Sequence, residues 1–139
     1  MTPVMDIPAL TQFLADVFPQ VCDDFTVLAV TDDGITVRLN VEERHLRPGN
    51  TVSGPSMFAL ADVAVYLAVL SRVGPKALAV TTNCSIDFMR KPVAGVPLIA
   101  ECRLLKLGRV LAVGDALLFS EGMDQPVCRA TLTYSIPPK

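Results

Sequence analysis

The chain of 139 residues is apolar, because 51% of its residues are hydrophobic and only 19% are charged. The formal net charge of -2 and the lack of a basic run argue against nucleic acid as a partner. The length predicts a single domain over residues 1–139 with one hydrophobic core. The apolar composition further predicts a homo-oligomer, a dimer or a tetramer, in which subunits bury part of this surface against one another.

The sequence has no pattern typical of export or of membrane insertion. The first residues lack the basic start and the apolar core of a signal peptide. Asp62 interrupts the longest apolar stretch before it reaches the roughly 20 residues of a membrane span. We therefore expect a cytoplasmic protein without a membrane partner.

The cysteines are scattered along the chain, at Cys22, Cys84, Cys102 and Cys128, and there is a single histidine, His45. No pair of cysteines has the CxxC spacing, so we expect no metal site and no cofactor. Three of the four cysteines lie in apolar runs. This placement favours buried thiols over a catalytic cysteine.

The first third of the chain predicts a helix followed by a hairpin. Apolar residues at positions 10, 13, 14 and 17 have helical spacing, which predicts an amphipathic helix over 7–18 that ends at Pro19. Residues 25–30 and 35–39 read as two strands, and the Asp33-Gly34 step between them favours a tight turn.

Residues 42–51 are the most polar part of the chain and lead directly into a long apolar helix. We expect a loop here that lies over the start of that helix. His45 is a candidate to orient a substrate or to act as an acid, although a lone histidine in a loop more often does neither. Arg47 is a candidate cation for a carbonyl or a phosphate.

The long helix is the element around which the rest of the chain is organised. Pro55 suits the first position of a helix, with Ser53 or Gly54 as its cap, and Gly74 followed by proline ends it. Residues 57–70 are apolar on every side apart from one carboxylate and one tyrosine hydroxyl. Such a helix is predicted to be buried.

Asp62 is the only formal charge between residues 48 and 71, and a carboxylate that loses water needs partners. One interpretation makes Asp62 a general base or nucleophile that faces a cleft. The other makes it a cap for a neighbouring segment, or a side chain that faces outward through a gap in the packing. The free amide groups at the helix start, at Gly54, favour negative charge, so the two groups together fit acyl transfer.

The second half of the chain predicts four long strands, over 77–89, 97–106, 110–120 and 126–136, joined by short turns. Successive strands with short connections predict an antiparallel meander. The expected fold class is α+β, with a curved antiparallel six-stranded sheet wrapped around the central helix. The open sheet edge is where a second subunit would pack.

Three stretches resemble a known family. The runs GNTVSGPSMFALAD at 49–62, AVTTNCSIDFMRKP at 79–92 and LLKLGR at 104–109 closely resemble hotdog-fold acyl-CoA thioesterases of the phenylacetate-degradation (PaaI-like) type. The resemblance covers residues 35–137. It implies a hotdog fold and hydrolysis of the thioester of a small or medium acyl-CoA, aromatic groups included.

The resemblance also assigns roles to residues. In that family a His-Gly-Gly segment precedes the helix and an acid follows on it, which places Gly54 on the first Gly and Asp62 on the acid. This implies that Gly54 offers its amide to the thioester oxygen. Asp62, contributed by the partner subunit in many relatives, then activates water or attacks the carbonyl.

Two further catalytic candidates follow from the same resemblance. Arg47 occupies the place where relatives often carry Asn or His, and Thr81 matches a hydroxyl that some relatives use from the third strand. Thr82 is one position away, and neighbouring residues of a strand point to opposite faces, so only one of the two threonines can line the site.

The chain departs from the family pattern at Ser53 and Pro55, which stand where relatives keep His and Gly. Loss of the imidazole argues against the related hydratase chemistry. Thioester hydrolysis needs only a donor and a base, so it survives the change. The departures also support an alternative, a non-catalytic hotdog protein that binds acyl-CoA or another ligand, and a purely structural hotdog protein is a third possibility.

Other residues are expected to contact the substrate or its CoA portion. For the basic ones the competing interpretation is ordinary solvated turn charge, and for the methionine it is core packing. These candidates are Ser53, Asn50, His45, Met57, Arg90, Lys91 and Arg109.

Overall fold

The computed structural model describes residues 2–138. Within these residues, two α-helices, two short 3-10 helices and eight strands follow one another. In order they are α1 (Ile7–Val17), η1 (Cys22–Asp24), β1 (Phe25–Val30), β2 (Gly34–Leu39), η2 (Glu43–His45), β3 (Leu46–Arg47), β4 (Thr51–Val52), α2 (Gly54–Val73), β5 (Val80–Phe88), β6 (Leu98–Leu107), β7 (Leu111–Ser120) and β8 (Cys128–Ser135).

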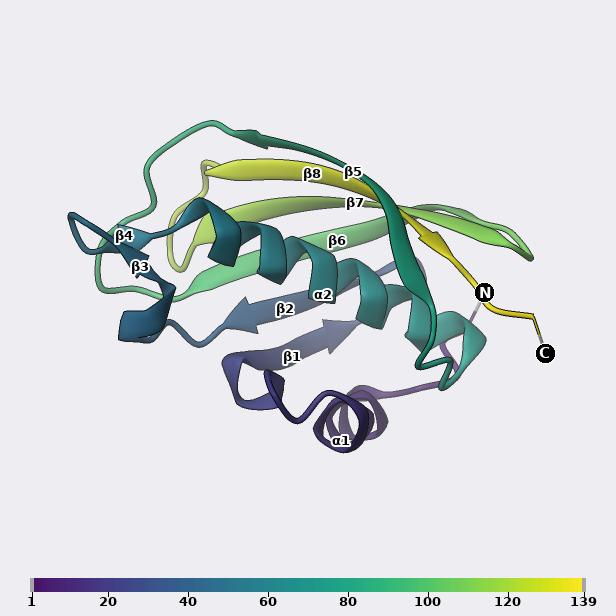
Figure 1. Ribbon diagram of the computed structural model, residues 1–139. Helices are drawn as coiled ribbons and strands as arrows, with labels where there is room; N and C mark the ends of the chain where they lie inside the picture. The colour runs from purple at the N-terminus through teal and green to yellow at the C-terminus, as the bar shows by residue number, and fades with distance from the viewer. Residues whose placement is uncertain (1, 139) are drawn as a thin grey trace.

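Six of the strands form one antiparallel sheet in the order β1-β2-β6-β7-β8-β5. The sheet curves around α2, and α1 lies beside β1 (Figure 1). This arrangement confirms the predicted α+β fold with a long helix inside a curved six-stranded sheet, which is the hotdog architecture that the resemblance implies.

The position of β5 corrects the predicted meander. β5 pairs with β8 and not with β6, the strand that follows it in sequence. β2 already occupies the free side of β6. β5 therefore pairs at the opposite edge of the sheet, and it crosses α2 near the C-terminal end of that helix (Figure 1).

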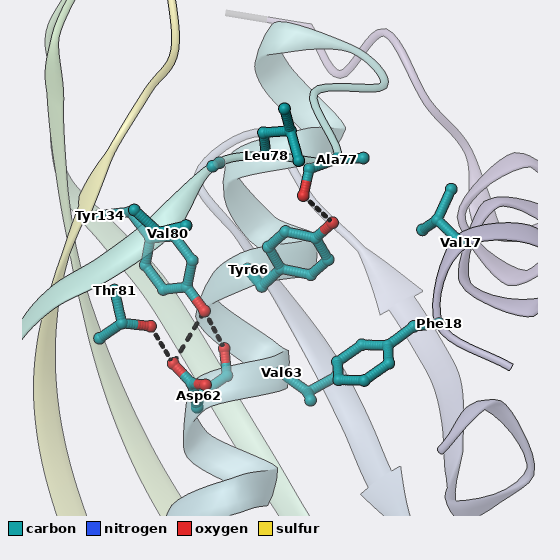
Figure 2. A pocket seen from close by; sticks show the side chains of 11 residues that line it. Val17, Phe18, Asp62, Val63, Tyr66, Ala77, Leu78, Val80, Thr81 and Tyr134 are labelled. Atoms are coloured by element: carbon teal, nitrogen blue, oxygen red, sulfur yellow. Dashed lines mark hydrogen bonds between the residues drawn. The ribbon is translucent and has the colours of Figure 1, made fainter. Parts of the chain in front are cut away.

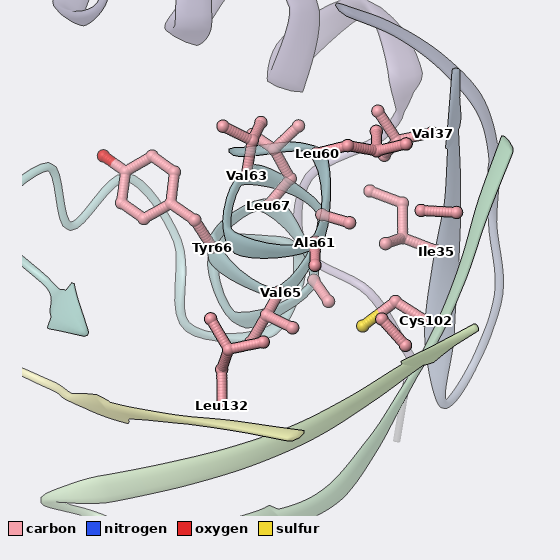
Figure 3. Packing of buried hydrophobic residues seen from close by; sticks show 14 of the residues in the cluster. Ile35, Val37, Leu60, Ala61, Val63, Val65, Tyr66, Leu67, Cys102 and Leu132 are labelled. Carbon is pink, nitrogen blue, oxygen red and sulfur yellow. The ribbon is translucent and has the colours of Figure 1, made fainter. Parts of the chain in front are cut away.

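The central helix begins and ends as the sequence predicts. The Ser53 hydroxyl oxygen caps it by accepting the N–H of Ser56 at 3.3 Å, and Gly74, with φ of 90°, ends it. Side chains on almost every side of α2 are buried, and Figure 3 shows Leu60 beside Val37 of β2 and Val65 beside Leu132 of β8. By length and composition alone α2 would be long enough to cross a membrane, but 72% of its most apolar stretch is buried inside the protein.

The structure requires glycine at position 34 because two strands approach closely there, whereas the sequence indicates a tight turn. Gly34 is the first residue of β2 and not a turn residue with positive φ. A Cβ at this position would lie only 1.9 Å from the carbonyl oxygen of Cys102 on β6. Close approach of two strands therefore selects glycine here.

Gly34→Ala is expected to lower the free energy of unfolding by about 3 kcal/mol, because the β2–β6 pair must move apart to admit the methyl group. Urea denaturation followed by circular dichroism measures the change. Gly54→Ala is the control, since its new methyl meets only the Phe88 ring at 3.5 Å. Equal stabilities of the two variants would contradict the steric explanation.

The polar segment 42–51 is more ordered than the predicted loop. It forms η2 and the small β3–β4 hairpin, which lies at the N-terminal end of α2 (Figure 1). Within η2, the Nδ1 atom of His45 accepts the backbone N–H of Glu42 at 2.8 Å. This side-chain cap helps to order a segment for which the polar composition alone predicts a loop.

Candidate active site

Asp62 lies on α2, half-buried, with its carboxylate held by two hydroxyl groups. Its Oδ1 atom accepts hydrogen bonds from the Thr81 hydroxyl at 2.5 Å and from the Tyr134 hydroxyl at 2.8 Å (Figure 2). The Tyr134 hydroxyl also lies 3.0 Å from the main-chain oxygen of Asp62. The carboxylate is therefore neither free in bulk solvent nor the cap of a remote loop.

The register of two strands brings both hydroxyl groups to Asp62. Thr81 on β5 and Tyr134 on β8 are direct partners in the antiparallel pair, and both side chains point toward α2 (Figure 2). The register shifts between Thr81 and Asn83. Thr82 is exposed and its hydroxyl bonds the backbone oxygen of Thr133. Thr81, and not Thr82, is the threonine that reaches the carboxylate.

Sequence reasoning missed Tyr134. The signal was present, because alternate residues of β8 are buried and Tyr134 continues the buried face of Cys128, Ala130 and Leu132. A tyrosine on a buried face needs a partner for its hydroxyl. The sequence does not say which partner, since Asp62 is 72 residues away.

A cavity of about 400 Å³ adjoins Asp62. Most of the side chains around it are apolar, and Asp62 is the one charged residue among the described residues that line it (Figure 2). The Tyr66 hydroxyl donates a hydrogen bond to the backbone oxygen of Ala77 at 3.0 Å. The lining residues are Val17, Phe18, Asp62, Val63, Tyr66, Ala77, Leu78, Ala79, Val80, Thr81 and Tyr134.

The titratable neighbours of Asp62 are held in their neutral forms. Burial raises the pKa of Tyr134, and the negative charge of Asp62 raises it further. Burial likewise raises the pKa of Tyr66, and burial together with Asp62 raises the pKa of Cys84. Tyr134 therefore remains a hydrogen-bond donor at neutral pH.

Cys102 and Cys128 are poor nucleophiles for the same reason. Burial is the largest cause that raises the pKa of Cys102 to about 12 and that of Cys128 to about 11. Since the thiolate is the reactive form, these thiols are inert at neutral pH. Among residues 2–138, no cluster of three or more His, Cys, Asp or Glu side chains is arranged to hold a metal ion.

Gly54 presents a single amide at the start of α2. Pro55 has no N–H, the N–H of Ser56 donates to the Ser53 hydroxyl, and the N–H of Met57 donates to the Ser53 carbonyl at 3.0 Å. The Gly54 N–H has no partner within the described part of the chain. It is thus the free donor at the positive end of the helix dipole.

The remaining upstream candidates are placed in different environments. Arg47 and Asn50 are exposed on the β3–β4 hairpin, where Asn50 has a φ of 64°. His45 is buried, with Nδ1 bonded within η2 and Nε2 3.4 Å from the Asp24 carboxylate. Met57 is buried in the core and does not line the cavity beside Asp62. A role for His45 in substrate binding receives no support from these contacts.

The candidate phosphate-binding cations are not brought together in one chain. Arg90 and Lys91 are exposed just after β5, and the Arg90 guanidinium donates to the backbone oxygen of Pro126 at 2.8 Å. Arg109 is exposed in the β6–β7 turn, at the opposite end of the sheet (Figure 1).

Comparison with known proteins identifies relatives of this chain. Residues 49–127 match the family model of the thioesterase superfamily. A putative esterase of Pseudomonas aeruginosa is 33% identical over 104 residues, which cover 74% of this chain and 75% of the relative.

Solved structures agree with this family. The crystal structure of a putative thioesterase from Silicibacter sp. TM1040 is 63% identical, with 99% of this chain and 96% of that chain covered and a TM-score of 0.93. A mutant of the phenylacetic acid degradation protein PaaI from Thermus thermophilus is 28% identical, with 86% and 99% covered and a TM-score of 0.73. The chain belongs to the thioesterase superfamily and has its hotdog fold.

Proposed function

We propose that this protein is an acyl-CoA thioesterase that hydrolyses the thioester of a small or medium acyl group, aromatic groups included. The observation that carries the proposal is the Asp62 carboxylate, held by two hydroxyl groups at the edge of an apolar cavity. The cavity volume falls within the range of small-molecule sites, so we assign the cavity to the acyl group.

The proposed chemistry needs one base and one donor. Water attacks the thioester carbonyl carbon as Asp62 takes its proton, and the oxygen that gains negative charge accepts the Gly54 N–H. The tetrahedral intermediate then collapses, the C–S bond breaks, and the CoA thiolate takes the proton back from Asp62. In the second form of the reaction Asp62 attacks the carbonyl carbon itself, the C–S bond breaks and the CoA thiolate leaves, which gives a mixed anhydride. Water then hydrolyses the anhydride to the free acid and the Asp62 carboxylate, and the proton released goes to the CoA thiolate.

In the proposed reaction, the distance between these two groups is too long for one subunit to supply both. Gly54 and Asp62 are eight residues apart on one helix, which separates them by about 12 Å along its axis. One carbonyl cannot reach both. We therefore propose a homo-oligomer in which Asp62 of one protomer faces the Gly54 amide of its partner.

The edge of the sheet supports this assembly. Within residues 2–138, β5 is an edge strand that pairs on one side only, and the hydrophobic residues Val80 and Phe88 on it are 55% and 52% exposed. Unpaired apolar edges are rare in monomers. A second copy that pairs with β5 would cover this edge and bring two α2 helices together.

The CoA portion is proposed to lie outside the cavity. Arg47 and Asn50 beside the start of α2, and Arg90 and Lys91 after β5, are the exposed polar side chains that can meet its phosphates and pantetheine. Arg109 would have to come from another subunit, because it lies at the far end of the sheet.

A screen of acyl-CoA substrates with a thiol-detecting reagent tests the proposal. We expect release of CoA from short, medium or aromatic acyl-CoAs, with loss of activity for chains too large for the cavity. Calorimetric titration with CoA itself is run in parallel. Binding of CoA without thiol release from any substrate would reject the enzyme in favour of the acyl-CoA-binding alternative.

A further inference from the structure

Tyr134 is buried, yet its hydroxyl reaches the one carboxylate of the cavity. Only 3% of the residue is exposed, and its hydroxyl oxygen lies 2.8 Å from Oδ1 of Asp62. A phenylalanine would fill the same space in the core. The hydroxyl is therefore explained by what it binds, and not by packing.

The Tyr134 ring is fixed from several directions. Its backbone pairs with Thr81 on β5 and with Ala112 on β7, so it belongs to an interior strand. Its ring contacts the Tyr66 ring, with centroids 5.9 Å apart and an interplanar angle of 33°. A donor on such a rigid support holds its acceptor in one orientation.

The two donors select one oxygen of the carboxylate. Each hydroxyl has a single proton to donate, and the Thr81 hydroxyl contacts Oδ1. The Tyr134 hydroxyl lies 2.8 Å from Oδ1 and 3.0 Å from the main-chain oxygen of Asp62, and the charged Oδ1 is both the nearer and the stronger acceptor. Oδ2 has no hydrogen-bond partner within residues 2–138. Rotation of the carboxylate would break both bonds, so Oδ2 remains the oxygen available to substrate or water.

Within residues 2–138, no cation pairs with Asp62 in place of these donors. The negative charge of Asp62 raises the pKa of Cys84 on β5 and of Tyr134 on β8, and the ring of Tyr66 on α2 packs beside Tyr134. None of them carries a positive charge, and no ion pair of Asp62 occurs in the described part of the chain. The orientation of the carboxylate therefore depends on the two hydroxyls.

We propose that Tyr134 is a positioning residue, which with Thr81 holds Oδ1 of Asp62 so that Oδ2 takes the proton from water or attacks the thioester. This inference rests on the proposed function, because it assigns Oδ2 a task in that reaction. Neither the helix motif nor the strand motif of the sequence includes Tyr134.

Tyr134→Phe tests the proposal through kcat and KM. We expect kcat to fall about tenfold with KM within twofold of wild type, because the ring stays and one hydrogen bond to a charged group is lost. Thr131→Val is the matched comparison. It also removes a hydroxyl of β8 that donates to a carboxylate, but to that of Asp115 at 3.1 Å, and neither residue lines the cavity beside Asp62. A kcat for Tyr134→Phe within twofold of that for Thr131→Val would overturn the proposal.

A spectroscopic measurement separates this proposal from the proposed function. In protein labelled with ¹³C-tyrosine, we expect a slowly exchanging Tyr134 hydroxyl proton in the NMR spectrum that shifts in Asp62→Asn and is lost in Tyr134→Phe. The signal does not depend on turnover. If wild type hydrolyses no acyl-CoA, the proposed function fails, and a hydroxyl proton that Asp62→Asn leaves unmoved would independently overturn the role of Tyr134.

Discussion

Asp62→Asn is expected to lower kcat for the best acyl-CoA substrate by a factor of about 10³, the middle of the range for loss of a general base. The Asn oxygen can still accept hydrogen bonds from Thr81 and Tyr134, so the fold should persist. The Asn nitrogen that replaces Oδ2 cannot take a proton or attack a carbonyl. Steady-state kinetics measure the loss, and calorimetric titration with CoA checks that binding remains.

Asp124→Asn is the control for this substitution. Asp124 is exposed in the turn between β7 and β8 and does not line the cavity beside Asp62. The same chemical change there should leave kcat within twofold of wild type. Asp62→Asn with more than a tenth of wild-type kcat would show that hydrolysis does not depend on this carboxylate.

The sequence predicts the parts of this protein that depend on local pattern. Burial of α2, its Ser53 cap and its end at Gly74 follow from composition and from the preferences of helix termini. Asp62 stands out because it is the one charge in the apolar body of that helix. A carboxylate among apolar residues needs partners, and the structure supplies them.

Prediction from the sequence fails where the structure depends on pairing between strands that are far apart in the chain. Nothing local places β5 next to β8, so neither the shifted register at Thr81 nor the partnership of Tyr134 with Asp62 can be derived in advance. Gly34 shows the same limit, because a glycine after aspartate favours a turn, whereas the close approach of Cys102 is visible only in the folded sheet.

Gly54→Pro is expected to lower kcat by a factor of about 10² to 10³, the typical cost of losing one oxyanion donor. Proline removes the N–H without removing a helix hydrogen bond, because the first residues of a helix have no intrahelical partner for this group. The extended backbone of Ser53, with φ of -74° and ψ of 157°, is compatible with a following proline.

Gly54→Ala is the control, because it adds the same Cβ before Pro55 and keeps the amide donor. Its methyl would meet the Phe88 ring at 3.5 Å, an ordinary contact. We expect kcat within threefold of wild type for the alanine variant. Equal losses in the two variants would assign the effect to the added carbon and remove Gly54 from the oxyanion site.

Mixing the two inactive variants decides whether the site spans two subunits. In a hybrid dimer of Asp62→Asn and Gly54→Pro protomers, one shared site combines the intact Asp62 of one protomer with the intact Gly54 of the other. Random assembly makes half of the dimers hybrids with one working site each, so on the order of a quarter of wild-type activity should return after refolding together. If each site belonged to one protomer, every site would carry a defect and no activity would return. The axial separation of the two residues on one helix, about 12 Å for eight residues at about 1.5 Å each, is the physical reason to expect recovery.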